Sequence, residues 1–160
     1  MTILNLQEKQ GPIYVREIEI RYKKQRVKQD AAVHKSLTSA AEVVALFRDL
    51  ENETKEKLIT INLDSQYKIL CFEMVGMGAV NSFYVRPMEV FRTAFPVNAY
   101  GAIVIHNHPS GDPTPSEEDA RFTQKLMRLA NDMGLEFVDH IVVGNNGYFS
   151  FREQGLLSPE

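Results

Sequence analysis

The feature that most constrains the fold of this chain is a short apolar run, Gly101-Ala-Ile-Val-Ile105, that ends at His106. A strand with one face in water alternates apolar and polar residues, whereas a strand buried on both faces is a continuous apolar run. The run therefore predicts a strand inside a sheet that is covered on both sides. The rest of the chain must supply the neighbouring strands and the layers that cover them.

Two helices are predicted ahead of this strand. Ser39 and Glu42 have the spacing of a capping box, and apolar residues recur after them at helical intervals. We therefore expect a helix over 40–52. Pro87 is typical of a first helical turn and predicts a short helix to about Phe95.

A longer helix is predicted after the strand. It begins at Ser116, beyond a segment whose prolines and glycine exclude regular structure, and it ends at about Met133, where Gly134 closes it. Its apolar residues recur at helical spacing, so we expect them to face the core. These residues are Phe122, Leu126, Leu129, Ala130 and Met133.

Strand patterns occupy most of the remaining chain. The turn Asp64-Ser65-Gln66 separates two apolar segments and predicts an antiparallel meander, and Asn145-Asn146-Gly147 predicts a hairpin near the end. The whole pattern is α/β, a mixed sheet with helices packed on it. The predicted strands are 58–63, 69–75, 80–85, 101–105, 137–143 and 148–151.

The composition is that of one globular domain. The 160 residues are 44% hydrophobic and 24% charged, which suits a chain with a substantial core. We find no apolar run long enough to cross a membrane and no leader pattern, so we expect a soluble protein with no membrane partner.

The single cysteine, Cys71, excludes an internal disulfide and a cysteine-rich zinc site, and it fits a reducing compartment such as the cytoplasm. We expect Cys71 to be a small buried apolar side chain.

The first 37 residues are predicted to form a basic strand or hairpin that extends the domain at its N-terminus. Apolar residues alternate irregularly with charges over 13–28. The net charge of −3 argues against binding nucleic acid through bulk charge. One positive cluster allows a weak DNA contact through residues 16–28, although a strand edge guarded by basic residues explains it better. Its members are Arg16, Arg21, Lys23, Lys24, Arg26 and Lys28.

Residues able to bind a metal gather where the buried strand ends. His106 and His108 are two residues apart in extended chain, so both imidazoles point the same way and can bind one ion. A loop rich in proline and glycine brings the chain back to the predicted helix, whose first turn adds the carboxylate of Asp119. Two imidazoles and one carboxylate leave a fourth tetrahedral position for water, which is the arrangement of catalytic zinc.

Each part of this pattern also has a simpler explanation. A His-x-His pair alone is a weak signal of a metal, and Asp119 could be no more than the partner of Ser116 in a capping box. The position of these residues favours the metal site over the simpler explanations, because a loop at the end of a buried strand is where α/β proteins bind ligands. We therefore predict a Zn²⁺ site formed by His106, His108 and Asp119.

The same residues carry a resemblance to a known family. His106-x-His108-Pro109, followed after seven residues by Ser116-x-x-Asp119, resembles the JAMM (MPN-plus) zinc metalloprotease motif. The full sequence from His106 to Ser116 is similar to the RadC-like branch of that superfamily, and so are Asp139-His140 and Tyr148-Phe-Ser-Phe-Arg-Glu153. The likeness covers about residues 38–157. It implies a three-layer α/β/α sandwich like that of cytidine deaminases, zinc on the two histidines and the aspartate, and a Ser116 that helps to stabilise an oxyanion.

The JAMM pattern also includes an upstream glutamate that acts as general acid and base. In RadC-like chains a glutamate directly precedes the first hydrophobic strand of the meander, and the matching residue here is Glu56. Glu56 could instead be a solvated member of the acidic run 51–56, and Glu73 is a rival on a predicted strand. Position favours Glu56, since a proton shuttle must reach both the water and the leaving group, and the end of a strand allows this better than its middle.

Two further candidates have a structural interpretation. Asp139 and His140 are neighbours on a predicted strand, so one must face each side of the sheet, and one of them could support the zinc site while the other packs. We favour packing roles for both. His34 stands in the basic N-terminal segment with no partner nearby in sequence.

The resemblance implies a zinc metallopeptidase that cleaves peptide or isopeptide bonds in a peptide or protein substrate. RadC-like proteins commonly carry a helix-hairpin-helix segment ahead of this domain, and the first 35 residues here look like a basic strand instead, so a DNA role of that segment is not implied. The alternative is a non-enzymatic DNA-repair or mobile-element accessory module with a vestigial metal site. A zinc nucleobase deaminase needs a Pro-Cys-x-x-Cys pair, which one cysteine excludes, and the common zinc-peptidase helix needs His-Glu-x-x-His, which is absent.

Overall fold

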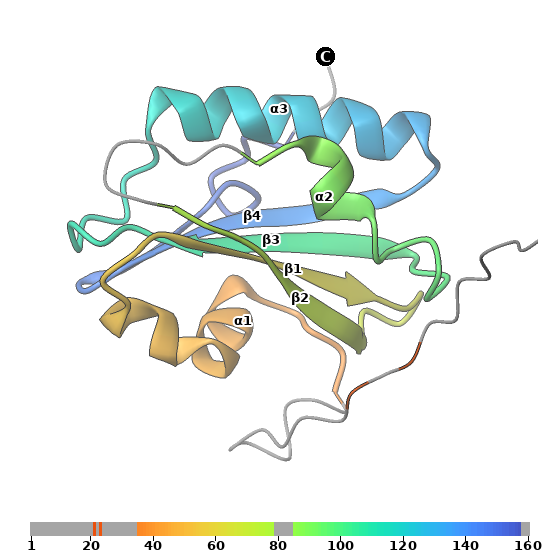
Figure 1. Cartoon of the computed structure of the whole chain (residues 1–160), viewed down its shortest axis with the longest axis horizontal. Coiled ribbons are helices and arrows are strands. Elements are labelled where there is room, and N and C mark those ends of the chain that lie inside the picture. Colours follow the sequence, from red (N-terminus) through yellow and green to blue (C-terminus); the bar gives the residue numbers. More distant parts are fainter. Residues whose placement is uncertain (1–20, 22, 24–34, 79–84, 158–160) are drawn as a thin grey trace, which may run out of the picture.

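The structure, a computed structural model, describes residues 21, 23, 35–78 and 85–157. A five-stranded sheet lies at the centre of the described chain (Figure 1). Residues 80–84 of the predicted strand over 80–85, most of the predicted basic strand or hairpin over 13–28, and His34 lie outside the described residues. Val85, the last residue of that predicted strand, is described and lies outside the strands. The elements, in chain order, are α1 (Ala40–Leu46), the 3-10 helix η1 (Arg48–Asn52), β1 (Lys57–Leu63), β2 (Ile69–Met77), α2 (Pro87–Phe91), β3 (Gly101–Asn107), α3 (Glu117–Asp132), β4 (Glu136–Gly144) and β5 (Gly147–Ser150).

The strands form one mixed sheet in the order β2-β1-β3-β4-β5. β1 pairs antiparallel with β2 and β3, and β4 pairs antiparallel with β5, whereas β3 and β4 run parallel. β3 is therefore the central strand, and every one of its residues is buried, as the apolar run 101–105 predicts. α3 makes the crossover from β3 to β4, which a parallel pair requires.

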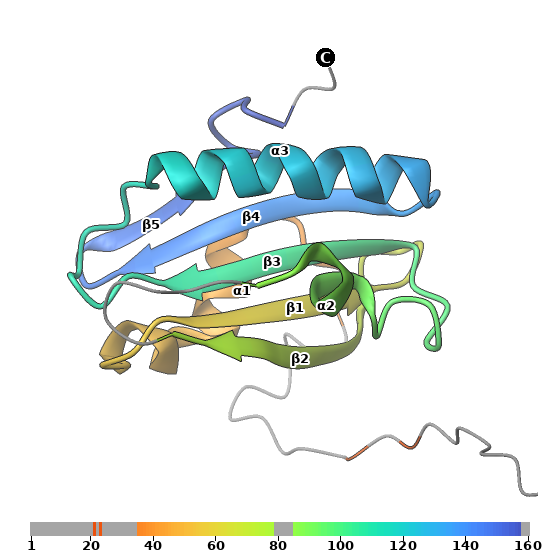
Figure 2. The same cartoon turned by 45° about the horizontal axis from the view of Figure 1, so that its top comes forward.

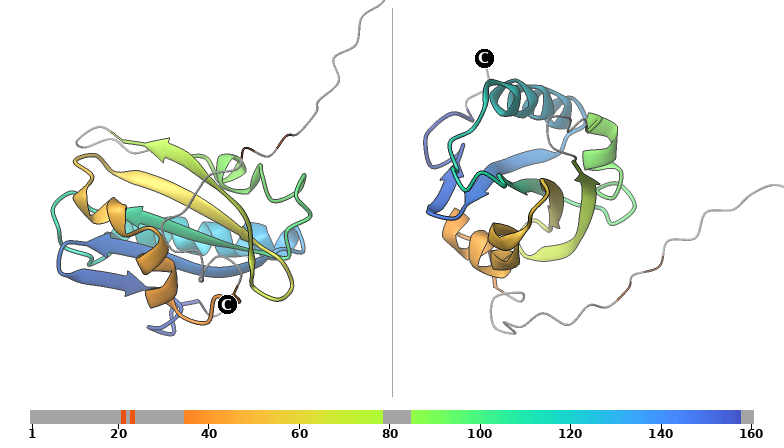
Figure 3. Two further views of the ribbon diagram at one scale, coloured as in Figure 1. Left: turned by 90° about the horizontal axis from the view of Figure 1, so that it is seen from below. Right: turned by 60° about the vertical axis from the view of Figure 1, so that its left-hand side comes forward.

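Helices cover both faces of this sheet. α1 and η1 lie on one face, and α2 and α3 lie on the other (Figures 1 and 2); the end-on view in Figure 3 shows the sheet between the two layers. β3 contributes to both cores by alternation, with Ile103 and Ile105 in the cluster under α1 and with Ala102 and Val104 in the cluster under α3. The fold is thus the α/β sandwich with a mixed sheet that the resemblance implies.

The end of α3 departs from the expected packing. Leu126 and Ala130 are fully buried, as predicted, but Met133 caps the helix C-terminus with 38% of its surface exposed. Gly134 adopts a φ of 69°, a left-handed conformation that turns the chain away from the helix axis. Leu135, the residue after this turn, is buried in the same core as Leu126 and Ala130.

Three local predictions on the other elements also need correction. The helix predicted over 40–52 is two pieces, because Phe47 (φ −110°, ψ 27°) ends α1 and the chain continues as η1. α2 ends at Phe91, short of Phe95. Cys71 is half-buried because β2 is an edge strand, and its Sγ accepts a hydrogen bond from the side-chain amide of Asn62 at 3.5 Å.

None of the helices in the described part of the chain has both the length and the apolar character that crossing a bilayer requires.

Candidate metal centre

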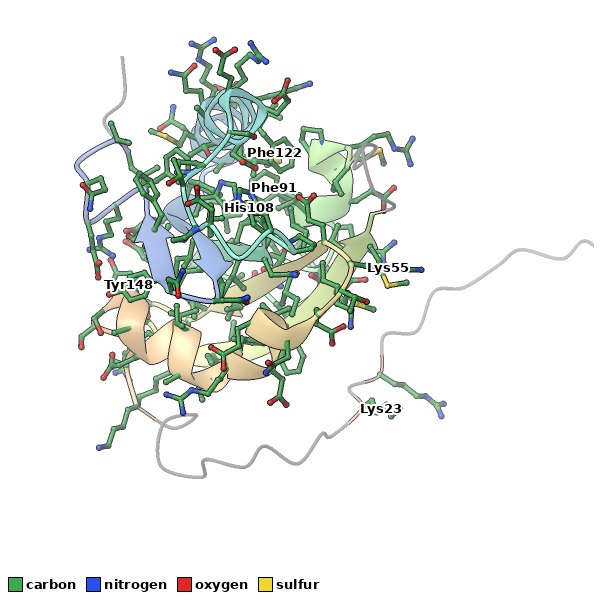
Figure 4. All side chains as sticks on the ribbon, turned by 90° about the vertical axis from the view of Figure 1, so that its left-hand side faces the viewer. Lys23, Lys55, Phe91, His108, Phe122 and Tyr148 are labelled. Atoms are coloured by element: carbon green, nitrogen blue, oxygen red, sulfur yellow. The ribbon has the colours of Figure 1, made fainter. Side chains whose placement is uncertain are left out.

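The two histidines of the motif lie at the C-terminal end of the central strand. His106 is the sixth residue of β3 and is 1% exposed, whereas His108 follows the strand and is half-buried. The backbone N–H of His108 donates to the carbonyl of Val143 at 2.9 Å, which extends the pairing of β3 with β4 past the last strand residue. Figure 4 looks onto this end of the sheet, where His108 lies below α3. Both histidines therefore lie at the same end of the sheet.

The carboxylate of Asp119 reaches both histidines from the first turn of α3. Its Oδ1 lies 3.2 Å from Nε2 of His106, and its Oδ2 lies 3.4 Å from Nε2 of His108. The two Nε2 atoms are 3.1 Å apart. Ligands about 2.1 Å from a tetrahedral zinc ion stand roughly 3.4 Å from one another, so this spacing is close to what such an ion requires. The three side chains form a group that could hold a metal ion.

The protonation of His108 also suits a metal ligand. Its Nδ1 lies 2.9 Å from the backbone carbonyl oxygen of Asp112. A carbonyl oxygen can only accept, so Nδ1 carries a hydrogen. Hydrogen bonds to the Asp119 carboxylate and to the Asp112 carbonyl raise the pKa of His108. In the neutral imidazole, the form that binds a metal, the lone pair is on Nε2, the nitrogen nearest Asp119 and His106. The Pro- and Gly-rich loop thus has a defined role, because its bend brings the Asp112 carbonyl back to the imidazole.

The capping box and the ligand role of Asp119 coexist. The hydroxyl of Ser116 accepts from the N–H of Asp119 at 3.1 Å, and Asp119 Oδ2 accepts from the N–H and the hydroxyl of Ser116 at 2.7 and 2.6 Å. Burial acts to raise the pKa of Asp119, but the imidazoles of His106 and His108 outweigh it and hold that pKa far below its ordinary range. The cap therefore orients an ionised carboxylate toward the histidines.

Glu56 is the further carboxylate at this centre. It directly precedes β1, and its Oε1 lies 4.0 Å from Nε2 of His106. Burial raises the pKa of Glu56, and the imidazole of His106 acts in the opposite direction. Glu73, the rival, is engaged elsewhere, because its carboxylate accepts hydrogen bonds from the guanidinium of Arg92. The structure therefore brings Glu56, and not Glu73, to the three candidate ligands.

Asn107, between the two histidines, has a role that the sequence pattern does not predict. It is 1% exposed, and its side chain bonds three backbone groups of the segment that carries Glu56. Oδ1 accepts from the N–H of Lys57 at 2.9 Å, and Nδ2 donates to the carbonyls of Glu53 and Lys55 at 3.3 and 3.1 Å. An asparagine in the motif was visible, but its partners are about fifty residues away in sequence.

Asp139 and His140 do face different surroundings. Asp139 accepts from the hydroxyl of Ser150 and from the N–H groups of His140 and Arg152, so it ties β4 to the C-terminal turn. His140 instead faces the metal centre, where its Nε2 lies 2.9 Å from Nδ1 of His106. Burial holds the pKa of His140 well below its ordinary value. The packing role fits Asp139, whereas His140 contacts a candidate ligand directly.

Comparisons with known proteins agree with this geometry. A sequence model of the RadC-like JAB domain matches residues 37–156. The chain is 37% identical to a UPF0758 protein of Aquifex aeolicus over 122 residues, which are 76% of this chain and 53% of that protein. It is 38% identical to one of Thermotoga maritima over 125 residues, 78% of this chain and 56% of the relative. The chain spans about half the length of these curated relatives. Because the matched segment contains the strand, loop and helix that bring the two histidines and the aspartate together, this chain belongs to the RadC-like JAB domain family.

Proposed function

We propose that this protein is a zinc-dependent hydrolase that cleaves peptide or isopeptide bonds. The observation that carries the proposal is the convergence of His106, His108 and Asp119, whose ligand atoms all lie within 4.8 Å of one another, with Glu56 beside them. Nitrogen and carboxylate donors of this kind suit zinc, and three protein ligands leave a position open for water. The choice of peptide or isopeptide bonds rests on the chemistry of the JAMM superfamily.

The residues of the chain divide the work of hydrolysis between them. A bound zinc ion supplies Lewis acidity and brings the pKa of water near neutrality. Glu56 accepts the proton of the attacking water and returns it to the leaving amine, and its raised pKa favours this exchange at neutral pH. The hydroxyl of Ser116 donates its one hydrogen to Asp119 Oδ2 at 2.6 Å, and it turns that hydrogen to the oxyanion that develops next to the ligands.

Metal content is the first test. Purified protein should retain about one zinc per chain after mild zinc loading and dialysis, as measured by elemental analysis. His106→Ala and His108→Ala should lose it in a folded protein. Asp119→Ala also removes a cap, so Asp119→Asn, which keeps an oxygen for the N–H of Ser116, separates loss of the ligand charge from loss of the helix end. Unchanged zinc content in the folded histidine variants would refute the site.

Hydrolysis is the second test. A library of peptides and isopeptide-linked conjugates, screened by mass spectrometry, should yield a substrate whose cleavage stops with a chelator and resumes with zinc. Cleavage that His106→Ala retains would come from a contaminating enzyme. A zinc-loaded protein that cleaves no member of the library favours the alternative, an accessory module with a vestigial metal site.

A further inference from the structure

His140 and Thr123 form a hydrogen-bonded chain with His106 that the proposed hydrolysis does not use directly. His140 is fully buried, with Nε2 2.9 Å from Nδ1 of His106 and Nδ1 2.6 Å from the hydroxyl of Thr123. That hydroxyl also lies 2.7 Å from the backbone carbonyl of Asp119. We propose that Thr123 and His140 are positioning residues that hold His106 in the tautomer whose Nε2 lone pair faces the metal. The inference rests on the metal site of the proposed function.

The direction of each hydrogen bond follows from the carbonyl at the start of the chain. The carbonyl oxygen of Asp119 can only accept, so the single hydroxyl hydrogen of Thr123 points to it. The Thr123 oxygen must then accept from Nδ1–H of His140.

The same constraint passes through the second imidazole. A neutral imidazole carries one N–H, so Nε2 of His140 is an acceptor and Nδ1 of His106 must donate to it. In neutral His106, the form that can bind a metal, Nε2 is then left without a hydrogen. It therefore presents a lone pair to the centre, as Nε2 of a neutral His108 does.

The chain of bonds matters because the opposite tautomer has a favourable partner of its own. An Nε2–H on His106 would find Oδ1 of Asp119 at 3.2 Å and could donate to it, which would close the site to a metal. Asp119 thus favours the wrong tautomer of the metal-free protein, and the Thr123–His140 chain opposes it. At His108 the carbonyl of Asp112 in the loop favours the Nδ1–H tautomer. His106 lies inside the central strand, where the partners of its ring are side chains.

The ring of His140 is itself held in one orientation. It stacks on Phe151 with a centroid distance of 5.2 Å and an interplanar angle of 9°, and the edge of Phe122 lies against it at 6.4 Å. A fixed ring plane keeps both nitrogens aligned with their partners. Because Thr123, Phe122 and Asp119 all belong to α3, the position of this helix sets both the third ligand and the tautomer of the first.

The tautomer can be read in the metal-free protein, without activity or zinc. Long-range ¹H–¹⁵N spectra distinguish the two forms of each imidazole, and the chain has only four histidines, so His106→Ala, His108→Ala and His140→Phe assign the signals. The wild-type protein should show Nδ1–H on both His106 and His140. Thr123→Val removes the acceptor of His140, so both rings should change to Nε2–H, and Thr123→Ser should restore the original pattern.

Zinc affinity provides the second readout. Thr123→Val and His140→Phe should weaken zinc binding by about 10- to 100-fold, the usual effect of removing a group that orients a ligand. Thr60→Val is the matched control, because Thr60 is equally buried and its hydroxyl has no hydrogen-bond partner. It should leave both the tautomers and the affinity unchanged.

The outcomes separate this inference from the proposed function. A folded Thr123→Val protein that keeps Nδ1–H on His106 and wild-type zinc affinity overturns the positioning role, and so does an Nε2–H on His106 in the wild type. Should His140→Phe not fold, the Thr123 series decides alone. A protein that shows the expected tautomers and affinities but hydrolyses nothing refutes the proposed activity and leaves the positioning role standing.

Discussion

The side chain of Asn107 and the backbone N–H of Lys57 are joined by a 2.9 Å hydrogen bond across fifty residues of sequence. This bond and two others from the same amide fasten the segment that carries Glu56 to the end of the strand that carries His106. Asn107, the one residue between the two histidines, therefore fixes the position of the Glu56 segment relative to them. Asn107 points away from them because side chains alternate along β3.

Asn107→Ala should separate turnover from metal binding. Its loss leaves buried backbone groups without partners, at a cost of about 1–3 kcal/mol each, and frees the Glu56 segment to move. We expect zinc content to stay near wild type while hydrolysis falls. Asn62→Ala is a matched control, since Asn62 is a buried asparagine of β1 whose partners, Thr93 and Cys71, lie outside the site. Equal losses of turnover in the two variants, at equal stability, would argue against a positioning role for Asn107.

Glu56→Gln should keep zinc and lose activity. General acid and base catalysis commonly contributes about 10²- to 10⁴-fold, so turnover should fall by that factor while elemental analysis still finds about one zinc per chain. Glu73→Gln is the control, because that carboxylate bonds to Arg92. If Glu73→Gln abolishes hydrolysis and Glu56→Gln does not, the proton shuttle is assigned to the wrong glutamate even though the ligands are correct.

Ser116→Ala should lose more activity than its effect on stability explains. Removing a serine N-cap costs about 0.5–2 kcal/mol of unfolding free energy, and removing an oxyanion donor costs roughly 10²- to 10³-fold in turnover. Ser39→Ala is the control, since Ser39 caps α1 by accepting from the N–H of Glu42. Denaturant titration and kinetics of the zinc-loaded proteins measure both effects. A turnover loss no larger than that of Ser39→Ala would limit Ser116 to capping.

Gly144→Ala should disturb the loop that fixes His108. A Cβ at Gly144 would lie 2.3 Å from the carbonyl oxygen of Gly111 and 2.7 Å from the backbone nitrogen of Pro113, which are rigid backbone atoms. We expect lower stability and weaker zinc binding by calorimetry. Gly134→Ala is the comparison, because its Cβ meets nothing within 4 Å and its φ of 69° costs about 1 kcal/mol far from the site. Unchanged zinc affinity in Gly144→Ala would show that the loop adapts.

DNA binding should be weak and dependent on the basic segment. The net charge is −3, and the positive cluster lies within residues 16–28, of which the structure describes Arg21 and Lys23. Titration with labelled duplex at physiological salt should give no tight complex. Any binding should fall when Arg21, Lys23, Lys24 and Arg26 are replaced by Gln. Tight binding that survives those changes would favour the accessory-module alternative.

Local sequence signals predicted most of the described elements and the grouping of the three candidate ligands. The apolar run 101–105 predicts a strand buried on both faces because burial removes the alternation that water imposes, and β3 is such a strand. Helical spacing after Ser116 predicts α3. The two-residue repeat of a strand turns His106 and His108 to the same side, and a short loop returns Asp119 to them, so the local sequence is enough to predict that the three donors meet. These features depend on contacts between residues close in sequence.

Tertiary structure alone decided what surrounds those ligands. The bonds from Asn107 to Lys57 and from His140 to His106 join residues 50 and 34 positions apart, and no local period encodes which strands become neighbours. Met133 is likewise exposed while Leu135 is buried, on the two sides of the turn at Gly134. A side chain's hydrogen-bond partners are set by strand order and register, which emerge from packing the whole sheet. The partner of each imidazole nitrogen at this centre could therefore be identified only from the folded chain.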